Sequence, residues 1–359
     1  MRVLVTGTEG YIGCLLAPHL VARGHDVLGV DTGFYRAGWL YNDATDTVET
    51  RNKDIRLLTA ADLEGVDAIV HMAELSNDPV GQLAPNVTRE INHQGSVHVA
   101  ATAKAAGVTR FVYTSSCSVY GAAISDLVDE ESPLAPQTEY AVCKELVERD
   151  LGAMADDDFS PTFLRNATAY GASPRMRFDI VLNNLAGLAW TTREIRMESD
   201  GTPWRPLVHV LDICAAVATV LEAPRERVHG QILNVGATDA NYQIREIAEL
   251  VGDVFPGCEV TVGERGADLR SYRVSFDKIH DLLPALSFEW DPARGARQLL
   301  DVFSRIELTG EDFLSRKFTR LKQIDYLLQT GQIDDAFLWR PLGVDRVEPS
   351  AARPAVGSS

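Results

Sequence analysis

Residues 2–31 read RVLVTGTEGYIGCLLAPHLVARGHDVLGVD. The apolar run Val3–Val5 leads into a turn that carries Gly7, Gly10 and Gly13, and a helical pattern of leucines follows. A chain that leaves a buried strand and turns at once into a helix needs backbone angles and close approaches that a Cβ would obstruct. We therefore predict a strand, a tight glycine turn and a helix.

A second strand and an acidic residue complete this unit. Residues 25–30 read as a buried strand that ends at Asp31. The first amides of the preceding helix, near Tyr11 and Ile12, lack partners within it, and the helix dipole is positive there, so a pyrophosphate can bind. A carboxylate about 20 residues after the glycines is placed to bond a ribose 2′-hydroxyl and to repel a 2′-phosphate. The unit thus predicts NAD rather than NADP.

The composition is that of a soluble globular protein, with 45% hydrophobic and 24% charged residues. The net charge is −17 and no basic run is present, so nucleic acid is not expected as a partner. The five cysteines form no Cys-x-x-Cys pair, and no cluster has the spacing of a metal site. We see no signal peptide and no apolar run of membrane-spanning length, and we expect a cytoplasmic protein without membrane contact.

Further buried strands are expected at residues 66–73, 109–116 and 161–166, separated by helices. This alternation predicts an α/β fold, a Rossmann-type doubly wound parallel sheet with right-handed crossovers and a smaller C-terminal substrate lobe. Ser76 and Asn77 follow the first of these strands, at the edge where such sheets bind ligands. The aromatic segment 32–54 is either a loop packed on the sheet edge or a cover for adenosine.

The regular alternation fails at residue 168 and returns near residue 208. We therefore predict an NAD-binding domain over 1–167, completed by about 207–237, and a substrate lobe formed by 168–206 and 238–300. A helical extension over 301–343 and a disordered tail over 344–359 follow. In the extension, a helically spaced apolar stripe of the kind that makes core or dimer contacts is formed by Leu314, Phe318, Leu321 and Leu328.

Candidate catalytic residues are Ser116, Tyr140 and Lys144. Tyr140 and Lys144 are four residues apart on a predicted helix and project from one face, so the ammonium can lie beside the phenol. A free phenol has a pKa of about 10, and a nearby ammonium together with a positive nicotinamide ring favours the phenolate. Ser116 ends a different strand and could orient the same substrate hydroxyl.

These features together resemble the extended short-chain dehydrogenase/reductases of the NAD-dependent epimerase/dehydratase family, whose members mostly act on nucleotide-sugars. The similarity runs from Met1 to about Trp290. Besides the glycine turn and the catalytic residues, its marks include Asp54-Ile55, His71-Met72-Ala73, Asn92, Asn183-Asn184-Leu185, Arg205 and Arg265.

The resemblance implies two sets of ligand contacts. The cofactor-binding residues would be Gly7, Gly10, Tyr11, Ile12, Gly13, Asp31, Asp54, Ile55, Met72, Ala73, Tyr140 and Lys144. Candidate contacts of a nucleotide-diphosphate sugar are Ser76, Asn77, Cys117, Ser118, Thr168, Asn184, Arg205 and Arg265. The arginines suit a diphosphate in a very acidic protein. The resemblance also implies a homodimer formed through the helices near Asn92 and Tyr140.

Departures from the family pattern narrow the choice among the reactions that the family catalyses. Family 4,6-dehydratases place an Asp-Glu pair where this chain has Cys117 and Ser118, which argues against that reaction. Cys117 itself is left open between packing and substrate contact. The usual Arg-x-x-Asn contact appears as Arg165-Asn166-Ala167-Thr168, and Glu74 replaces a small residue near the nicotinamide.

The leading hypothesis is a nucleotide-sugar 4-epimerase, in which Tyr140 takes a proton from a sugar hydroxyl and a transient ketone forms beside tightly bound NAD+. The alternative is a dehydrogenase or reductase with net redox change, whose NAD(H) exchanges with solvent. A non-catalytic nucleotide sensor or scaffold on the same fold is a third possibility, and the presence of Ser116, Tyr140 and Lys144 argues against it.

Overall fold

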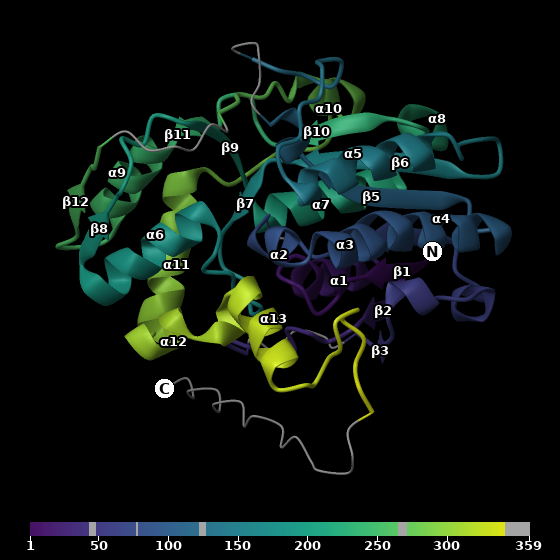
Figure 1. Ribbon diagram of the computed structural model, residues 1–359. Coiled ribbons are helices and arrows are strands. Elements are labelled where there is room, and N and C mark those ends of the chain that lie inside the picture. The colour runs from purple at the N-terminus through teal and green to yellow at the C-terminus, as the bar shows by residue number, and fades with distance from the viewer. Residues whose placement is uncertain (43–47, 77, 122–126, 265–270, 342–359) are drawn as a thin grey trace.

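The computed structural model of the chain describes residues 1–42, 48–76, 78–121, 127–264 and 271–341. Its centre is a seven-stranded sheet of order β10-β6-β5-β4-β1-β2-β3, in which all neighbouring strands are parallel (Figure 1). The strands are β1 Arg2–Thr6, β2 Asp26–Asp31, β3 Thr50–Asn52, β4 Ala68–His71, β5 Arg110–Ser116, β6 Ser160–Asn166 and β10 Ile232–Val235. The predicted Rossmann-type doubly wound sheet is confirmed.

Helices cover both faces of this sheet, which explains why its strands are apolar on both sides. Val3 and Val5 of β1 pack in one apolar cluster with side chains of α1 (Gly13–Ala22) and α7 (Val210–Glu222). Leu4 points to the opposite face and packs in a second cluster. The helices of that second face are α4 (Ser96–Ala105) and α5 (Glu139–Gly152), and α2 (Asp78–Leu83), α3 (Pro85–Thr88) and a π-helix (Arg89–Gly95) lead into α4.

A second lobe has its own apolar cluster. Its main helices are α6 (Val181–Thr192), α9 (Ile244–Val254) and α11 (Pro292–Arg305), which lie together beside the central sheet (Figure 1). Its small sheets are β7 (Thr168–Tyr170) with β9 (Trp204–His209) and β11 (Asn241–Gln243), and β8 (Glu194–Arg196) with β12 (Glu259–Thr261). The alternation that returns near residue 208 begins with β9, which pairs with β7 in the second lobe and does not join the central sheet. The edge of the central sheet beside β6 is occupied by β10.

Short elements connect these parts. They are α8 (Arg225–Val228), α10 (Asp277–Leu282) and the 3-10 turns Ile55–Leu57, Ala60–Leu63 and Cys117–Tyr120.

The C-terminal extension folds differently from its prediction. It contains α12 (Gly310–Leu314), a 3-10 turn (Arg316–Phe318) and α13 (Arg320–Gln329), and α11 continues past the predicted start of the extension at residue 301. The single apolar stripe was wrong, because the turn interrupts the helical period. Leu314 is 63% exposed, Phe318 packs in the second lobe, and Leu321 and Leu328 pack against the second face of the central sheet.

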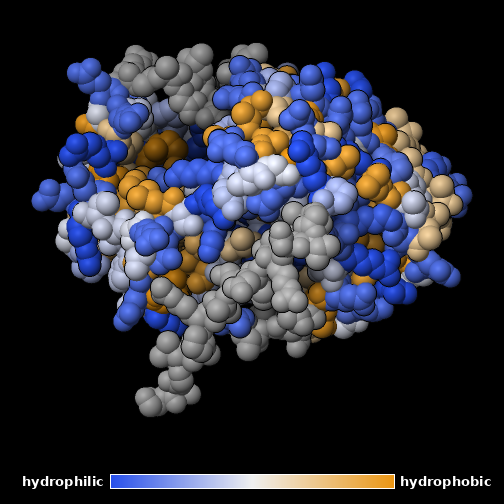
Figure 2. Space-filling view, turned by 60° about the horizontal axis from the view of Figure 1, so that its bottom comes forward, coloured by the Kyte–Doolittle hydropathy of each residue, from blue (hydrophilic) through white to orange (hydrophobic). Residues whose placement is uncertain are grey.

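The surface agrees with the acidic composition. Figure 2 shows a largely hydrophilic face on which apolar side chains form small, separate patches. Within the described ranges, the helices are too short or too polar to cross a membrane.

A buried ion pair fixes α5 to the sheet. Arg165 of β6 lies 2.7 Å from the Glu148 carboxylate of α5, and both side chains are buried. The Ser115 hydroxyl of β5 donates to the same carboxylate. Arg165 also donates to the Tyr120 hydroxyl at 3.0 Å. Glu148 is one helical turn after Lys144, so this pair helps to set the position of the catalytic helix.

Replacing Glu148 with alanine is expected to lower the free energy of unfolding by about 3–5 kcal/mol, because Arg165 would remain buried without its partner. Chemical denaturation of the two proteins measures the difference. The control is Glu194→Ala, which breaks an exposed pair with Arg196 and should change stability by less than about 1 kcal/mol. Equal effects of the two substitutions would contradict the role given to the buried pair.

Candidate active site

A cleft of about 1100 Å³ runs along the carboxyl ends of the central strands and reaches the second lobe. Most of the predicted ligand contacts line it. They are Gly7, Gly10, Tyr11, Ile12, Gly13, Asp31, Asp54, Ile55, Met72, Ala73, Ser76, Ser116, Ser118, Tyr140, Lys144, Thr168 and Arg205. The topology therefore brings together residues that lie up to 198 positions apart in the sequence, between Gly7 and Arg205.

The glycine turn has the close packing that its sequence predicts. Gly7 has a φ of +80°, which favours glycine. A Cβ on Gly13 would lie 2.1 Å from the carbonyl oxygen of Gly7, so no larger residue fits while the turn keeps this shape. Helix α1 begins at Gly13, and Tyr11, Ile12 and Gly13 line the cleft at the positive end of the helix dipole. This cradle fits the pyrophosphate of a dinucleotide.

Asp31 lies at the end of β2, where its carboxylate accepts the amides of Glu9 at 3.0 Å and Gly33 at 2.7 Å. Burial raises the pKa of Asp31. Asp54 caps a 3-10 turn and is paired with Arg56 at 2.7 Å.

The Tyr11 hydroxyl points away from the dinucleotide cradle. It donates to the carbonyl of Gly171 at 2.7 Å and accepts from Asn183 at 3.2 Å, so its side chain ties the glycine turn to the second lobe.

Ser116, Tyr140 and Lys144 converge on the cleft from two elements. Ser116 ends β5, and its hydroxyl accepts the amide of Ser118 at 3.1 Å. Tyr140 lies in the first turn of α5, whose N-cap is Thr138. The Lys144 ammonium lies 5.4 Å from the centroid of the Tyr140 ring, as the four-residue spacing predicts. It donates to the carbonyl of Thr114.

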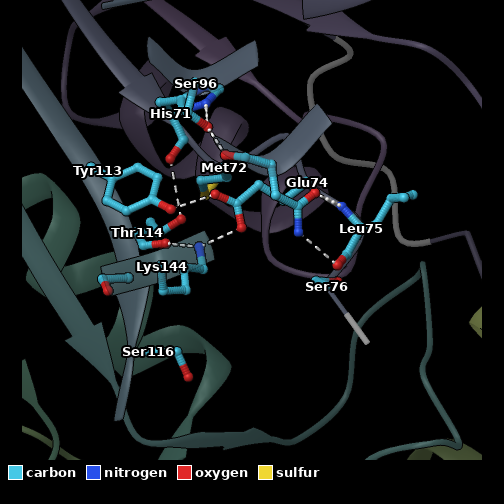
Figure 3. A network of polar contacts seen from close by, with 12 residues as sticks. His71, Met72, Glu74, Leu75, Ser76, Ser96, Tyr113, Thr114, Ser116 and Lys144 are labelled. Carbon is cyan, nitrogen blue, oxygen red and sulfur yellow. Dashed lines mark hydrogen bonds and ion pairs between the residues drawn. The ribbon is translucent and has the colours of Figure 1, made fainter. Parts of the chain in front are cut away.

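Glu74 is the unexpected member of this site (Figure 3). Its carboxylate lies 2.6 Å from the Lys144 ammonium and accepts the Tyr113 hydroxyl at 2.5 Å. The side chains of Glu74 and Lys144 are only 1% and 4% exposed. Burial alone would lower the pKa of Lys144, but the adjacent Glu74 carboxylate, together with Tyr140 and Glu148, raises it. Lys144 is therefore held as an ammonium ion.

His71 supports the segment that carries Glu74. Its two ring nitrogens lie 2.7 Å from the Thr6 hydroxyl and 2.8 Å from the Ser96 hydroxyl. Burial lowers the pKa of His71 to about 3, so the ring is neutral at ordinary pH. Thr6 in turn accepts the amides of Met72 and Ala73 at 3.1 Å. These bonds fix the end of β4 beside the glycine turn.

Two predicted substrate contacts do not line the cleft. Cys117 is buried in the turn after β5, where its thiol donates to the carbonyl of Arg165 at 3.1 Å. Burial raises its pKa, which suits packing and not contact with substrate. Asn184 points inside the second lobe and donates to the carbonyl of Phe178 at 2.9 Å. Asn77 and Arg265 lie outside the described residues.

Several polar residues of the cleft were not predicted from the sequence, among them Asn166, Arg177 and Arg320. The amide oxygen of Asn166 is buried without a hydrogen bond to any described residue, at the point where β6 meets the cleft. Arg177 pairs with Asp179 at 2.9 Å and donates to Ser76 at 3.2 Å. No sequence motif marked these residues, apart from the place of Asn166 beside the altered Arg165 contact.

Among the described residues, no group of three or more histidine, cysteine or acidic side chains is arranged to hold a metal ion.

Comparisons with known proteins agree with this geometry. Residues 3–236 match the model of the NAD dependent epimerase/dehydratase family. The chain is 25% identical to the UDP-glucose 4-epimerase of Bacillus subtilis, over 83% of this chain and 91% of that protein. It is 32% identical to the UDP-glucose 4-epimerase of Mycolicibacterium smegmatis, over 69% of this chain and 80% of that protein.

A solved structure shows the same architecture. It is DesIV, a dTDP-glucose 4,6-dehydratase from Streptomyces venezuelae, with NAD bound. The TM-score is 0.74 and the identity 27%, with 85% of this chain and 97% of that chain covered. Relatives of the chain thus include both epimerases and a dehydratase. From its glycine turn, its Ser116, Tyr140 and Lys144 and these likenesses, the chain belongs to the NAD-dependent epimerase/dehydratase family of extended short-chain dehydrogenase/reductases.

Proposed function

We propose that this protein is a nucleotide-sugar 4-epimerase that keeps NAD bound through each turnover. The proposal rests on which side chains of the cleft can act as an acid or a base. Ser116, Tyr140 and Lys144 line it together, and no acidic side chain of the described lining is free to act as a second acid or base. A 4-epimerase needs only one proton shuttle.

Four acidic side chains line the described part of the cleft, and each has a partner. The partners are backbone amides for Asp31, Arg56 for Asp54, Lys144 and Tyr113 for Glu74, and Arg177 for Asp179. Removal of water from a sugar needs an additional acid and base beside the reacting carbons. The two positions that supply them in dehydratases are Cys117 and Ser118 here, and Cys117 is buried. This distribution favours epimerisation over dehydration.

The residues of the site suit the proposed chemistry. Tyr140, as the phenolate, takes the proton of the sugar hydroxyl, and the Lys144 ammonium favours that ionised form. Ser116 holds the same hydroxyl in place. The glycine turn and Asp31 would hold NAD+, which would supply hydride transfer from the sugar carbon and back to the opposite face of the resulting ketone. Tyr140 then gives its proton back, so the protein ends the cycle unchanged.

Arg205 favours a diphosphate in the outer part of the cleft, where a nucleotide-sugar would bind. The UDP-glucose 4-epimerases among the relatives make a UDP-hexose the first candidate substrate.

The purified protein is expected to release about one NAD per chain on denaturation and to epimerise a nucleotide-sugar without added NAD. Mass spectrometry of the released cofactor, followed by incubation with UDP-, dTDP-, GDP- and CDP-sugars, tests both points. A product of unchanged mass identifies the epimerase and its substrate. Turnover only with added NAD(H), and a mass change of two hydrogens, would overturn the proposal in favour of a dehydrogenase or reductase.

Tyr140→Phe is expected to lower turnover on the identified substrate by about 10²–10⁴-fold, because the proton shuttle is lost. NAD retention and the unfolding midpoint, measured on the same preparation, show whether the site remains intact. Tyr326→Phe on α13 is the matched control and should keep wild-type turnover. Unchanged activity of Tyr140→Phe would remove Tyr140 from the mechanism.

Glu74→Gln is expected to move the acidic limb of the pH–rate profile to lower pH by about one unit. The substitution removes a negative charge beside Lys144, and loss of that charge favours the Tyr140 phenolate. Tyr113→Phe is the control, because it removes a hydrogen bond to Glu74 and keeps the charge. A Glu74→Gln profile that coincides with the wild-type profile would show that the carboxylate does not act on Tyr140.

A further inference from the structure

Arg320 is a buried cation at the wall of the cleft. It begins α13, in the extension that lies beyond the matched family region, and its side chain is 4% exposed. Its guanidinium carbon lies 3.9 Å from the centroid of the Tyr35 ring. Within the part of the chain that the structure describes, the guanidinium has this ring contact but no hydrogen bond or ion pair, although it lines the cleft.

The charges around Arg320 compensate its positive charge only in part. Arg177 is close enough to repel it, and Arg177 is itself paired with Asp179 in two contacts of 2.9 and 3.2 Å. Burial, followed by the repulsion from Arg177, lowers the pKa of Arg320 to about 10, and the attraction of Asp179 and Asp31 is smaller. A buried charge without a counter-charge is costly. An anion in the cleft would remove this cost.

The position of Arg320 indicates which anion binds. Its neighbours Asp31, at the end of β2, and Tyr35, in the turn that follows, line the same cleft as the glycine turn. Arg205 of β9, the candidate residue for binding the nucleotide-sugar, instead has its guanidinium over the ring of Tyr272. A guanidinium presents several N–H donors in one plane and matches phosphate oxygens in pairs. The neighbourhood of Arg320 is thus that of the dinucleotide.

We propose that Arg320 binds the pyrophosphate of NAD, so that the C-terminal extension forms part of the dinucleotide site. The inference rests on the proposed use of NAD. A nucleotide-sugar carries the same diphosphate chemistry, and the experiment below distinguishes the two ligands.

The extension holds Arg320 firmly in place. Gln323 donates to the carbonyl of Phe34 at 2.9 Å, and the Trp339 indole donates to the carbonyl of Thr32 at 2.6 Å. A Cβ on Gly38 would lie 2.3 Å from the carbonyl oxygen of Lys317, so the two segments meet backbone to backbone. The 32–42 segment is thereby packed between the sheet and the extension. A guanidinium fixed in this way loses little freedom when it binds a phosphate.

Binding measurements on the full chain test the proposal. Bound NAD is removed, and wild type, Arg320→Gln, Arg320→Lys and Lys322→Gln are titrated with NAD, adenosine and UDP. Lys322 is the matched control, because it is an exposed cation on the same helix α13 and does not line the cleft. Unfolding midpoints of the NAD-free proteins show whether each variant is folded.

We expect Arg320→Gln to raise the Kd for NAD about 10- to 100-fold, with a smaller rise for Arg320→Lys and none for Lys322→Gln. The Kd values for adenosine, which has no phosphate, and for UDP should not change. An equal loss of adenosine affinity would indicate a structural role and overturn the proposal. Weaker UDP binding with unchanged NAD binding would assign Arg320 to the nucleotide-sugar instead, and would overturn it as well.

These titrations do not depend on turnover. A wild-type protein that binds NAD and lacks epimerase activity would refute the proposed reaction and leave the role of Arg320 testable. Normal epimerase activity with an unchanged NAD Kd in Arg320→Gln would refute only the role of Arg320.

Discussion

Two buried ion pairs fix helix α5 to segments on either side of β5, and the geometry of the cleft depends on them. Lys144 is paired with Glu74 at the end of β4, and Glu148, one turn later, is paired with Arg165 of β6. Both pairs lie on the face of the helix that meets the sheet, so α5 can neither rotate nor slide without separating buried charges. Tyr140 lies on the same helix, so the orientation of α5 sets the orientation of its side chain. The position of the phenol is thus set by charges that lie deeper in the protein than the phenol itself.

The parts of the fold that follow local rules could be predicted from sequence. The close approach of Gly13 to Gly7 permits only glycine at position 13. A short apolar run followed by such a glycine turn therefore predicts a buried strand that leads into a helix. The Tyr140–Lys144 spacing fixes a shared helix face without knowledge of the rest of the chain. The predicted homodimer and the predicted domain boundaries remain predictions.

Other features depend on contacts between distant segments, which no local pattern records. Glu74 attracted notice only because it replaced a small residue, since its partner Lys144 lies 70 positions later in the sequence. The choice between packing and substrate contact for Cys117 depended on the 3-10 turn after β5, which directs its side chain into the interior. The place of Arg320 follows from the way the extension folds back over the 32–42 segment. Helical periodicity alone does not predict how the extension folds back.

The two walls of the dinucleotide cleft come from opposite ends of the chain, with the glycine turn near residue 10 and Arg320 in α13. A ribosome adds about 5–20 residues per second, so roughly 15 to 60 s separate the synthesis of the two walls. During that interval the first βαβ unit is already outside the ribosome with one side of its cleft open. A nascent chain that lacks α13 therefore exposes apolar surface of the first βαβ unit that α13 covers in the folded protein.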